Sequence, residues 1–272
     1  MSPIGIFDSG YGGLTILEEI RRVLPGYDYL YLGDNARAPY GTRSFQVVYE
    51  FTLQAVKRLF DEGCQLVILA CNTASAKALR TIQQNDLPQI DSEKRVLGVI
   101  RPTVEIISEL TQTNHIGILG TQGTIQSQSY PLEIQKLFPY IMVTGEACPM
   151  WVPLVENGEY NSSGADYFIQ KHIDSILEKD PVIDTLILGC THYPLLETKI
   201  KKFLPAGIKI VSQGKYVAAS LADYLKRHPE MESRFSKNGT LRFYTTESED
   251  KFTDMAGIFL KDKIKAERIS LE

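Results

Sequence analysis

Two cysteines carry the clearest chemical signal in this sequence, because each directly follows a short apolar run. Cys71 follows residues 66–70 (LVILA) and Cys190 follows residues 186–189 (LILG), and polar side chains come next in both cases. Such runs are typical of buried strands, and ligands of open α/β sheets bind outside the carboxyl ends of the strands. The sequence therefore predicts that both thiols lie at a binding site.

A pair of thiols suits one kind of chemistry in particular. A thiol with a pKa of about 8.5 can be held as a thiolate by neighbouring donors, and in its protonated form it can act as an acid. If Cys71 and Cys190 face opposite sides of one carbon atom, one removes a proton while the other delivers a proton to the opposite face. This exchange inverts the stereocentre and needs neither a covalent intermediate nor a metal. The alternative is that both cysteines are buried and only pack, as this residue type often does.

The other two cysteines have less polar surroundings. Cys64 lies in a turn between a helix and a strand, and we expect it to be a core residue. Cys148 precedes Pro149, and we interpret it as structural. Two disulfides among the four cysteines are an alternative that a reducing compartment and a chain of this length disfavour.

Polar residues also follow other apolar runs of the sequence. Hydroxyl groups, and the backbone N–H groups at the start of a following helix, suit a carboxylate ligand. Turn or cap roles are the alternative for Asp8, Ser9 and Thr73. The residues that could contribute to a site for a small acid are Asp8, Ser9, Asn72, Thr73, Thr121, Thr191 and His192.

Two further kinds of site have partial signals. The glycine run 10–13 (GYGG) resembles a dinucleotide-binding fingerprint, but its third glycine comes one position early and Thr15 stands in that place. We instead expect a tight turn that lets the substrate approach the backbone. Zinc is the other alternative, although structural zinc sites usually bring close ligand pairs from each side. Its candidate ligands are Cys71, Cys190, His192 and Asp8.

Short apolar runs alternate with amphipathic stretches along the chain. Helical spacing of apolar residues predicts helices over residues 44–60, 165–177 and 218–227, and a further helix over 250–260 in the tail. The alternation predicts an α/β protein with doubly wound, mainly parallel sheets. Strands are predicted over residues 3–7, 27–32, 66–70, 96–99, 115–119, 141–143, 185–188, 208–211 and 241–245, with a last one over 268–271.

Two pairs of segments resemble each other. Residues 4–7 (IGIF) match 116–119 (IGIL), and the segments that contain Cys71 and Cys190 also match each other. The number of residues between the two members is nearly the same in both pairs. The pattern favours two pseudo-symmetric α/β domains with the active site in the cleft between them. Proline and glycine occur near the two places where the chain is expected to pass from one domain to the other. They predict a discontinuous first domain over 1–98 and 212–272, and a second domain over 99–211.

Composition excludes several classes of function. Of the 272 residues, 43% are hydrophobic and 23% are charged, and the formal net charge is −4. This balance and the lack of a long basic run indicate no basic region that would bind nucleic acid or an anionic membrane. Neither a membrane span nor a signal peptide is indicated. We expect a cytoplasmic protein that acts on a small molecule.

Five blocks, taken in order, resemble the glutamate racemases of the aspartate/glutamate racemase superfamily. Their combination and order are more specific than any single motif, whereas residues 84–95 and the tail are less family-like. The blocks are residues 5–14 (GIFDSGYGGL), 33–41 (GDNARAPYG), 70–75 (ACNTAS), 153–156 (PLVE) and 189–195 (GCTHYPL).

The resemblance implies interconversion of L-glutamate and D-glutamate for peptidoglycan synthesis, without pyridoxal phosphate or another cofactor. It implies that Cys71 acts on D-glutamate and Cys190 on L-glutamate. Asp8 is similar to the family's auxiliary acid near Cys71, and His192 and Glu156 are similar to auxiliary groups near Cys190. A homodimer is also expected. The positions that match the family's substrate contacts are Asp8, Ser9, Tyr40, Gly41, Asn72, Thr73, Thr121, Thr191 and His192.

Two other functions stay open. Racemisation of aspartate is the nearest one, because the sequence does not locate the pocket for the substrate side chain closely enough to distinguish glutamate from aspartate. The other is a thiol redox protein or a zinc-binding protein, which would need the two thiols close enough to bond or to chelate.

Overall fold

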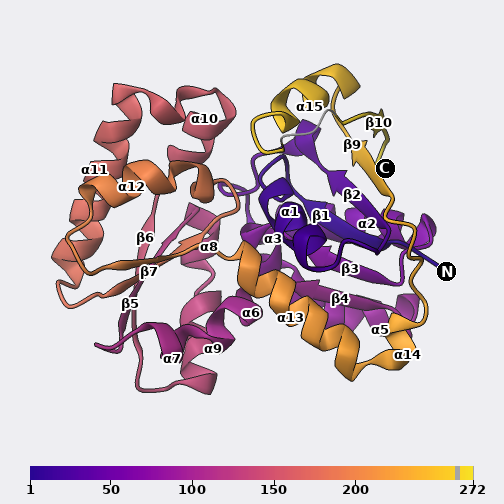
Figure 1. Cartoon of the computed structure of the whole chain (residues 1–272), viewed down its shortest axis with the longest axis horizontal. Helices are drawn as coiled ribbons and strands as arrows, with labels where there is room; N and C mark the ends of the chain where they lie inside the picture. The colour runs from indigo at the N-terminus through magenta and orange to yellow at the C-terminus, as the bar shows by residue number, and fades with distance from the viewer. Residues whose placement is uncertain (261–263, 272) are drawn as a thin grey trace.

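The computed structural model describes residues 1–260 and 264–271, which form two sheets flanked by helices (Figure 1). Neighbouring strands pair in parallel throughout both sheets, as predicted. The first sheet has the order β10-β9-β2-β1-β3-β4, and the second has the order β6-β5-β7-β8. We call the first sheet with its helices the first unit, and the second sheet with its helices the second unit.

The strands closely follow the predicted apolar runs. In the first sheet they are β1 (Ile4–Asp8), β2 (Tyr29–Gly33), β3 (Leu66–Leu69), β4 (Arg95–Gly98), β9 (Leu241–Thr245) and β10 (Ala266–Arg268). In the second sheet they are β5 (His115–Gly120), β6 (Met142–Ala147), β7 (Thr185–Gly189) and β8 (Lys209–Val211).

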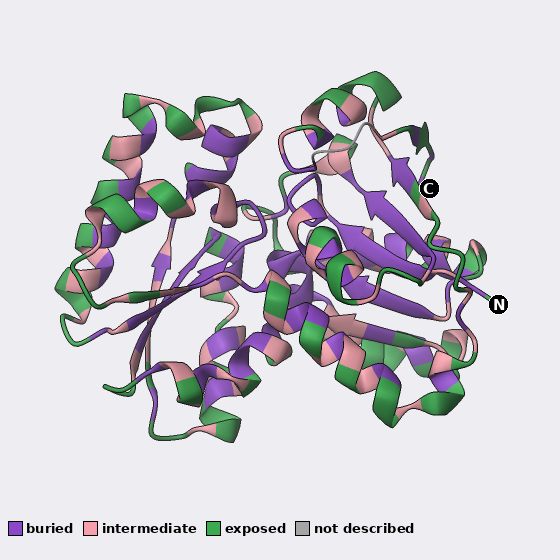
Figure 2. Ribbon diagram, viewed as in Figure 1, coloured by how far each residue is buried: buried purple, intermediate pink, exposed green. Residues whose placement is uncertain are grey.

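Helices cover both faces of the first sheet, which is why its central strands are buried (Figure 2). Alternate residues of a strand point to opposite faces. Ile4 and Ile6 pack in one core cluster with residues of α1 (Leu14–Val23) and α13 (Gly214–Arg227), whereas Phe7 packs in another with α2 (Phe45–Asp61). The sequence of a strand that is buried on both faces is a continuous apolar run, which explains why such runs predicted these strands.

The helices predicted from spacing are present. Ser44 caps α2 and Ser162 caps α11 (Ser163–Lys179), each accepting a hydrogen bond from a backbone N–H three residues later. The remaining helices are α3 (Asn72–Lys77), α4 (Leu79–Thr81), α5 (Leu87–Ile90), α6 (Ile100–Glu105), α7 (Ile107–Leu110), α8 (Gln122–Gln126), α9 (Ser129–Leu137), α10 (Trp151–Glu156), α12 (Glu197–Phe203), α14 (Pro229–Glu232) and α15 (Glu249–Ala256). A π-helical stretch covers Ile82–Asp86, and 3₁₀ turns cover Asn35–Arg37, Glu159–Asn161 and Tyr193–Leu196. In the described part of the chain, none of the helices has both the length and the apolar character of a membrane span.

The tail extends the first sheet, because β9 pairs with β2 and β10 pairs with β9. Two predicted boundaries in it were wrong: α15 ends at Ala256, and β10 precedes the run predicted over 268–271. Ile269 and Leu271 are nevertheless buried in the core cluster that contains α2. Their apolar pattern therefore reflects packing of side chains rather than strand pairing.

The two sheets share one connectivity. The order β2-β1-β3-β4 in the first sheet corresponds to β6-β5-β7-β8 in the second, so β3 and β7 occupy equivalent places. This correspondence agrees with the internal resemblance seen in the sequence. The chain passes between the sheets twice, through α6 after β4 and through α13 after β8.

Candidate active site

Cys71 and Cys190 line one cavity of about 110 Å³ between the two units. Cys71 follows β3 and Cys190 follows β7, so the equivalent strands of the two units deliver one thiol each. Both side chains are buried. The cavity is also lined by further predicted site residues, namely Ser9, Tyr40, Gly41, Asn72, Thr73, Thr121, Glu156, Thr191 and His192.

Cys71 lies at the N-terminus of α3, where its Sγ accepts a hydrogen bond from the backbone N–H of Ala74 at 3.5 Å. The hydroxyl of Ser9 lies 3.4 Å from the same sulfur. Burial, followed by the negative charge of Asp8, raises the pKa of Cys71 to about 12, although both hydrogen bonds act in the opposite direction. Cys71 is therefore a protonated thiol at neutral pH, and it has donors ready to stabilise its thiolate.

Cys190 has a different partner. Its Sγ lies 3.9 Å from Nδ1 of His192, whose Nε2 lies 2.9 Å from Oε1 of Glu156. Burial by itself lowers the pKa of His192, but the interactions with Cys190 and Glu156 outweigh it and raise that pKa to about 10. An imidazolium held between this carboxylate and the sulfur places a positive charge next to Cys190.

Asp8 is not among the residues that line the cavity, but its carboxylate accepts hydrogen bonds from both units. It is fully buried, it accepts a hydrogen bond from the backbone N–H of Gly10 at 2.9 Å, and it accepts a second one from the Thr191 hydroxyl at 3.3 Å. Burial raises the pKa of Asp8, and the positive charge of His192 partly offsets that effect. The sequence placed Asp8 beside Cys71 alone, whereas in the structure it also contacts the segment that carries Cys190.

The candidate substrate contacts form a polar wall across the boundary between the units. The hydroxyls of Thr73 and Thr121 lie 2.9 Å apart, and the backbone N–H of Gly123 donates to the carbonyl of Gly41 at 2.7 Å. The hydroxyl of Tyr40 donates to the buried carboxylate of Asp34, so that hydroxyl already has an acceptor.

Cys148 is a cavity residue that the sequence analysis missed. It is buried, it lines the cavity with Cys71 and Cys190, and burial followed by the charge of Glu146 raises its pKa well above the ordinary value. A signal existed, because Cys148 directly follows β6 just as Cys190 directly follows β7. The predicted strand ended at residue 143, whereas β6 continues to Ala147. Cys64, by contrast, is a core residue as predicted.

The glycine run 10–13 lies in the predicted turn, between β1 and α1, and two of its glycines pack closely against other side chains. A Cβ atom on Gly12 would lie 2.5 Å from Nδ1 of His192, and one on Gly13 would lie 2.5 Å from Cβ of Asp8. Neither glycine is among the residues that line the cavity. Gly12 and Gly13 therefore leave room for side chains of the protein, including one from the second unit.

The four cysteines are all free, and no three Cys, His, Asp or Glu side chains in residues 1–260 and 264–271 are placed to share a metal ion. The ligand set of the zinc alternative is thus not assembled.

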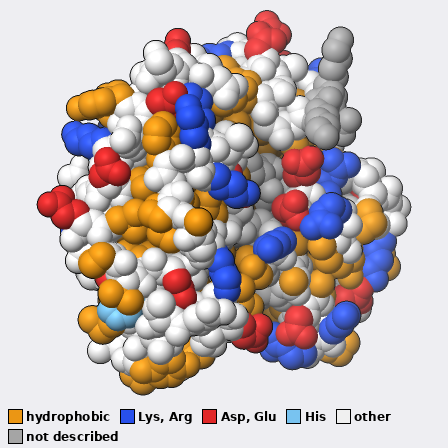
Figure 3. Space-filling model, turned by 60° about the vertical axis from the view of Figure 1, so that its left-hand side comes forward, with side chains coloured by type: hydrophobic (Ala, Val, Ile, Leu, Met, Phe, Trp, Pro, Cys, Tyr) orange, Lys and Arg blue, Asp and Glu red, His pale blue; other side chains and the backbone are white. Residues whose placement is uncertain are grey.

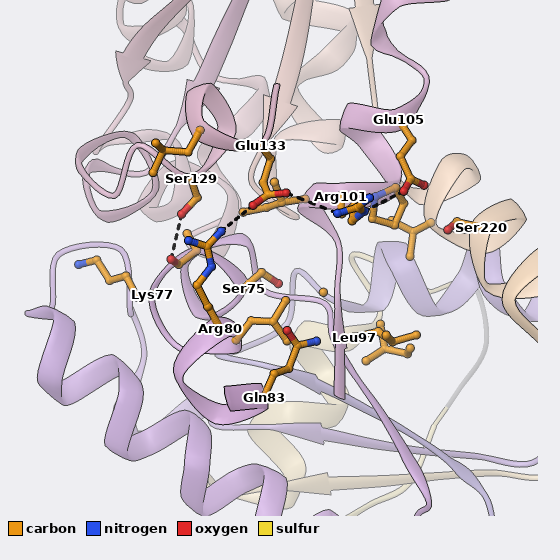
Figure 4. Close-up of a pocket in the computed structure, with 18 of the residues that line it drawn as sticks. Ser75, Lys77, Arg80, Gln83, Leu97, Arg101, Glu105, Ser129, Glu133 and Ser220 are labelled. Atoms are coloured by element: carbon orange, nitrogen blue, oxygen red, sulfur yellow. Dashed lines mark hydrogen bonds and ion pairs between the residues drawn. The ribbon is translucent and has the colours of Figure 1, made fainter. Parts of the chain in front are cut away.

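A second cavity of about 610 Å³ also lies between the units (Figure 4). An ion pair joins Arg80 of the first unit to Glu133 of the second at 2.7 Å, and Arg101 pairs with Glu105 of the same helix at 2.9 Å. Its described lining includes neither cysteine nor histidine, so the smaller cavity is the candidate active site.

Comparisons with known proteins agree with this geometry. The family model Asp/Glu/Hydantoin racemase matches residues 13–221. A glutamate racemase of Roseobacter denitrificans is 39% identical over 96% of this chain and 98% of its own length, and one of Streptococcus agalactiae is 38% identical over 99% and 98%.

Solved structures lead to the same family. Glutamate racemase RacE1 of Bacillus anthracis has a TM-score of 0.89 at 36% identity, covering 99% of this chain and 97% of its own. The Francisella tularensis enzyme, solved with D-glutamate, has a TM-score of 0.88 at 34% identity, covering 100% and 98%. An aspartate racemase of Picrophilus torridus is 16% identical with a TM-score of 0.53, and this likeness shows the fold alone. The chain therefore belongs to the Asp/Glu/Hydantoin racemase family and, within it, to the glutamate racemases.

Proposed function

We propose that this protein interconverts L-glutamate and D-glutamate by two-thiol acid–base catalysis at Cys71 and Cys190. The observation that carries the proposal is the pair of thiols that line one cavity from equivalent strands of two units. Their surroundings differ, since Nδ1 of His192 lies beside the sulfur of Cys190, whereas burial and the charge of Asp8 raise the pKa of Cys71. Two thiols with unlike surroundings suit complementary acid and base roles.

In the direction from L- to D-glutamate, the Cys190 thiolate removes the α-proton and becomes a thiol. The electron pair left on the α-carbon takes a proton from the Cys71 thiol on the opposite face, and Cys71 becomes a thiolate. Ser9 and the N–H of Ala74 then stabilise that thiolate. The return direction exchanges these roles, and proton exchange with solvent restores the starting state.

Asp8 and the pair of His192 and Glu156 have separate tasks in this scheme. The charge of Asp8 raises the pKa of Cys71 and so favours the thiol that donates the proton. His192, held by Glu156, places a positively charged group beside the sulfur of Cys190. Each auxiliary group therefore acts on a different thiol, as proposed from the family resemblance.

The substrate needs donors for its carboxylates, because negative charge develops next to the α-carboxylate as the proton leaves. Preorganised hydrogen-bond donors stabilise such charge most effectively in a buried site. The hydroxyls of Thr73 and Thr121 and the amide of Asn72 line the cavity and are the donors we assign to this task. Thr191, Ser9 and the backbone at Tyr40 and Gly41 complete the proposed substrate contacts.

The reaction itself is tested by incubating the purified protein with L-glutamate in deuterium oxide without added cofactor. We expect D-glutamate that carries deuterium at the α-carbon, because the incoming proton comes from a thiol that has exchanged with solvent. Parallel incubations contain L-aspartate, or L-glutamate with a metal chelator. Absence of deuterated D-glutamate would refute the proposal, preferential turnover of aspartate would favour the aspartate alternative, and loss of activity with the chelator would favour the zinc alternative.

The pH dependence of the reaction tests the role of His192. Its pKa is raised to about 10, so the imidazolium is present below that pH and is lost as the pH rises through it. We expect kcat/KM to fall on this alkaline side. Glu156→Gln removes one of the groups that raise the pKa of His192, so the fall of kcat/KM should shift to lower pH. The ammonium of the substrate titrates equally in both proteins, which makes the shift between them the readout. Glu159→Gln, an exposed change three residues away, is the control, and an unshifted profile in Glu156→Gln would contradict this role.

Further properties follow from the resemblance and belong to the same proposal. D-glutamate would serve peptidoglycan synthesis in the cytoplasm, and residues 1–98 with 212–272 and residues 99–211 would be the two domains. A homodimer is supported by hydrophobic side chains that gather on the face of the second unit shown in Figure 3. Leu132, Tyr140 and Met142 are large hydrophobic residues of this unit that are exposed. Light scattering tests the dimer, and a monomer at assay concentrations would contradict it.

A further inference from the structure

Gln213 is a buried polar residue that the proposed chemistry does not yet use. It directly precedes α13, where the chain returns from the second sheet to the first, and only 2% of its surface is exposed. Its Oε1 accepts a hydrogen bond from Nδ2 of Asn72 at 2.7 Å. The two N–H groups of its Nε2 are shared among three acceptors, which are the carbonyl of Val99 at 3.2 Å, the hydroxyl of Thr103 at 2.9 Å and the hydroxyl of Tyr130 at 2.7 Å.

Tyr130 of α9 completes this network. Its hydroxyl donates to Oδ1 of Asn72 at 2.7 Å and accepts a hydrogen bond from Nε2 of Gln213 at 2.7 Å. Tyr130 and Asn72 are as deeply buried as Gln213. Both ends of the Asn72 amide are therefore held by other side chains.

The backbone carbonyl of Val99 sets the direction of every bond in the network. A carbonyl can only accept, so Nε2 of Gln213 must face it and Oε1 of Gln213 must face Asn72. Asn72 then presents Nδ2 to Gln213 and Oδ1 to Tyr130. The second N–H of Nδ2 has no acceptor among the hydrogen bonds of the described residues, and Asn72 lines the catalytic cavity.

The network joins the active site to both passages of the chain between the units. Asn72 directly follows Cys71 in the first unit, Tyr130 belongs to the second unit, Val99 lies on the outward passage and Gln213 on the return. The orientation of the Asn72 amide thus depends on how the two units are placed. A buried network in which each member has a partner specifies one arrangement of its side chains.

We infer that Gln213 and Tyr130 are positioning residues that orient the Asn72 amide, so that its remaining N–H meets a carboxylate oxygen of the substrate. This inference rests on the proposed racemase function. Gln213 and Tyr130 themselves act through Asn72 and need not touch the substrate. Small errors in the placement of a substrate contact reduce the rate strongly, so loss of the network should lower kcat/KM measurably.

The test is a double-mutant cycle with racemisation of glutamate as the readout. Gln213→Ala should lower kcat/KM by about 10- to 100-fold in the wild-type background. In the Asn72→Ala background the same change should cost less than about twofold, because its target is absent. A merely structural role of Gln213 would give the same loss in both backgrounds, and that result would overturn the inference.

Tyr130→Phe provides a second, milder test that removes one hydroxyl and keeps the ring. It should lower kcat/KM in the wild-type background and have little effect after Asn72→Ala. The matched control is Tyr29→Phe, because Tyr29 is equally buried but its hydroxyl donates to the carbonyl of Leu24, away from the network. Equal effects of the two tyrosine changes would overturn the inference. Inactive wild-type protein would overturn the proposed function and this inference together, whereas an active wild type with additive losses would overturn this inference alone.

Discussion

Replacing either Cys71 or Cys190 by alanine is expected to lower glutamate racemisation by at least about 10³-fold, the largest effect of any single change considered. Positioned acid or base groups contribute about 10² to 10⁴-fold to a rate, and racemisation uses one on each face of the substrate. Neither remaining thiol can serve both faces, since the two approach the cavity from different units. Chiral separation of the products measures the loss.

Cys64→Ala is the matched control for this pair. Cys64 is as buried as Cys71 and Cys190, but it packs in the core of the first unit and is not among the residues that line the cavity. Its replacement should reduce stability, as large-to-small changes in a core do, while racemisation continues. Substantial racemisation in either Cys71→Ala or Cys190→Ala would contradict the requirement for two thiols.

Gly12→Ala is expected to lower kcat/KM by about 100-fold in a protein that still folds. The added methyl group would lie 2.5 Å from Nδ1 of His192 and would also collide with the hydroxyl of Thr191. These atoms belong to the segment after Cys190, so relief of the collision moves the histidine away from that thiol or moves the units apart. A displacement of this kind costs about two orders of magnitude in rate, whereas overpacking costs about 1 to 3 kcal/mol of stability.

Gly26→Ala is the control for that change. A Cβ atom on Gly26 would have no heavy-atom neighbour within 4 Å, so the substitution should leave activity and melting temperature almost unchanged. Kinetic constants and thermal unfolding of both variants separate loss of geometry from loss of fold. Wild-type kcat/KM in Gly12→Ala would show that the second unit does not need to approach this loop so closely.

The local features of this fold were predictable from the sequence. Buried parallel strands appear as continuous apolar runs, so residues such as 66–70 identified their strands and placed Cys71 at a strand end. The matching run before Cys190 placed the second thiol in the same way. Equivalent positions in two similarly connected sheets then brought both thiols to one cavity.

Contacts between the units were not predictable, because no local pattern encodes them. The hydrogen bond from Thr191 to Asp8 and the closeness of Gly12 to His192 depend on how the two sheets are placed. Cys148 was missed for a different reason. β6 is less buried than the central strands and reads as apolar only at its beginning, so its end could not be recognised.

The unlike surroundings of the two thiols have a limited kinetic consequence. L-glutamate and D-glutamate have equal free energy in water, so kcat/KM must be equal in the two directions for every variant. Changes at Asp8 or His192 can therefore alter kcat and KM differently for the two enantiomers, but only in compensating ways. The asymmetry between Cys71 and Cys190 is visible only in experiments that observe each face alone.

Exchange of the α-hydrogen in the single-cysteine variants is the most direct test of the two-thiol mechanism. Cys71→Ala retains Cys190, so in deuterium oxide it should label L-glutamate without inverting it and leave D-glutamate unlabelled. Cys190→Ala should show the opposite preference, as Cys71 serves the other face. Mass spectrometry of the separated enantiomers measures both. Labelling of both enantiomers by one variant, or the reversed preference, would contradict the assignment of one thiol to each face.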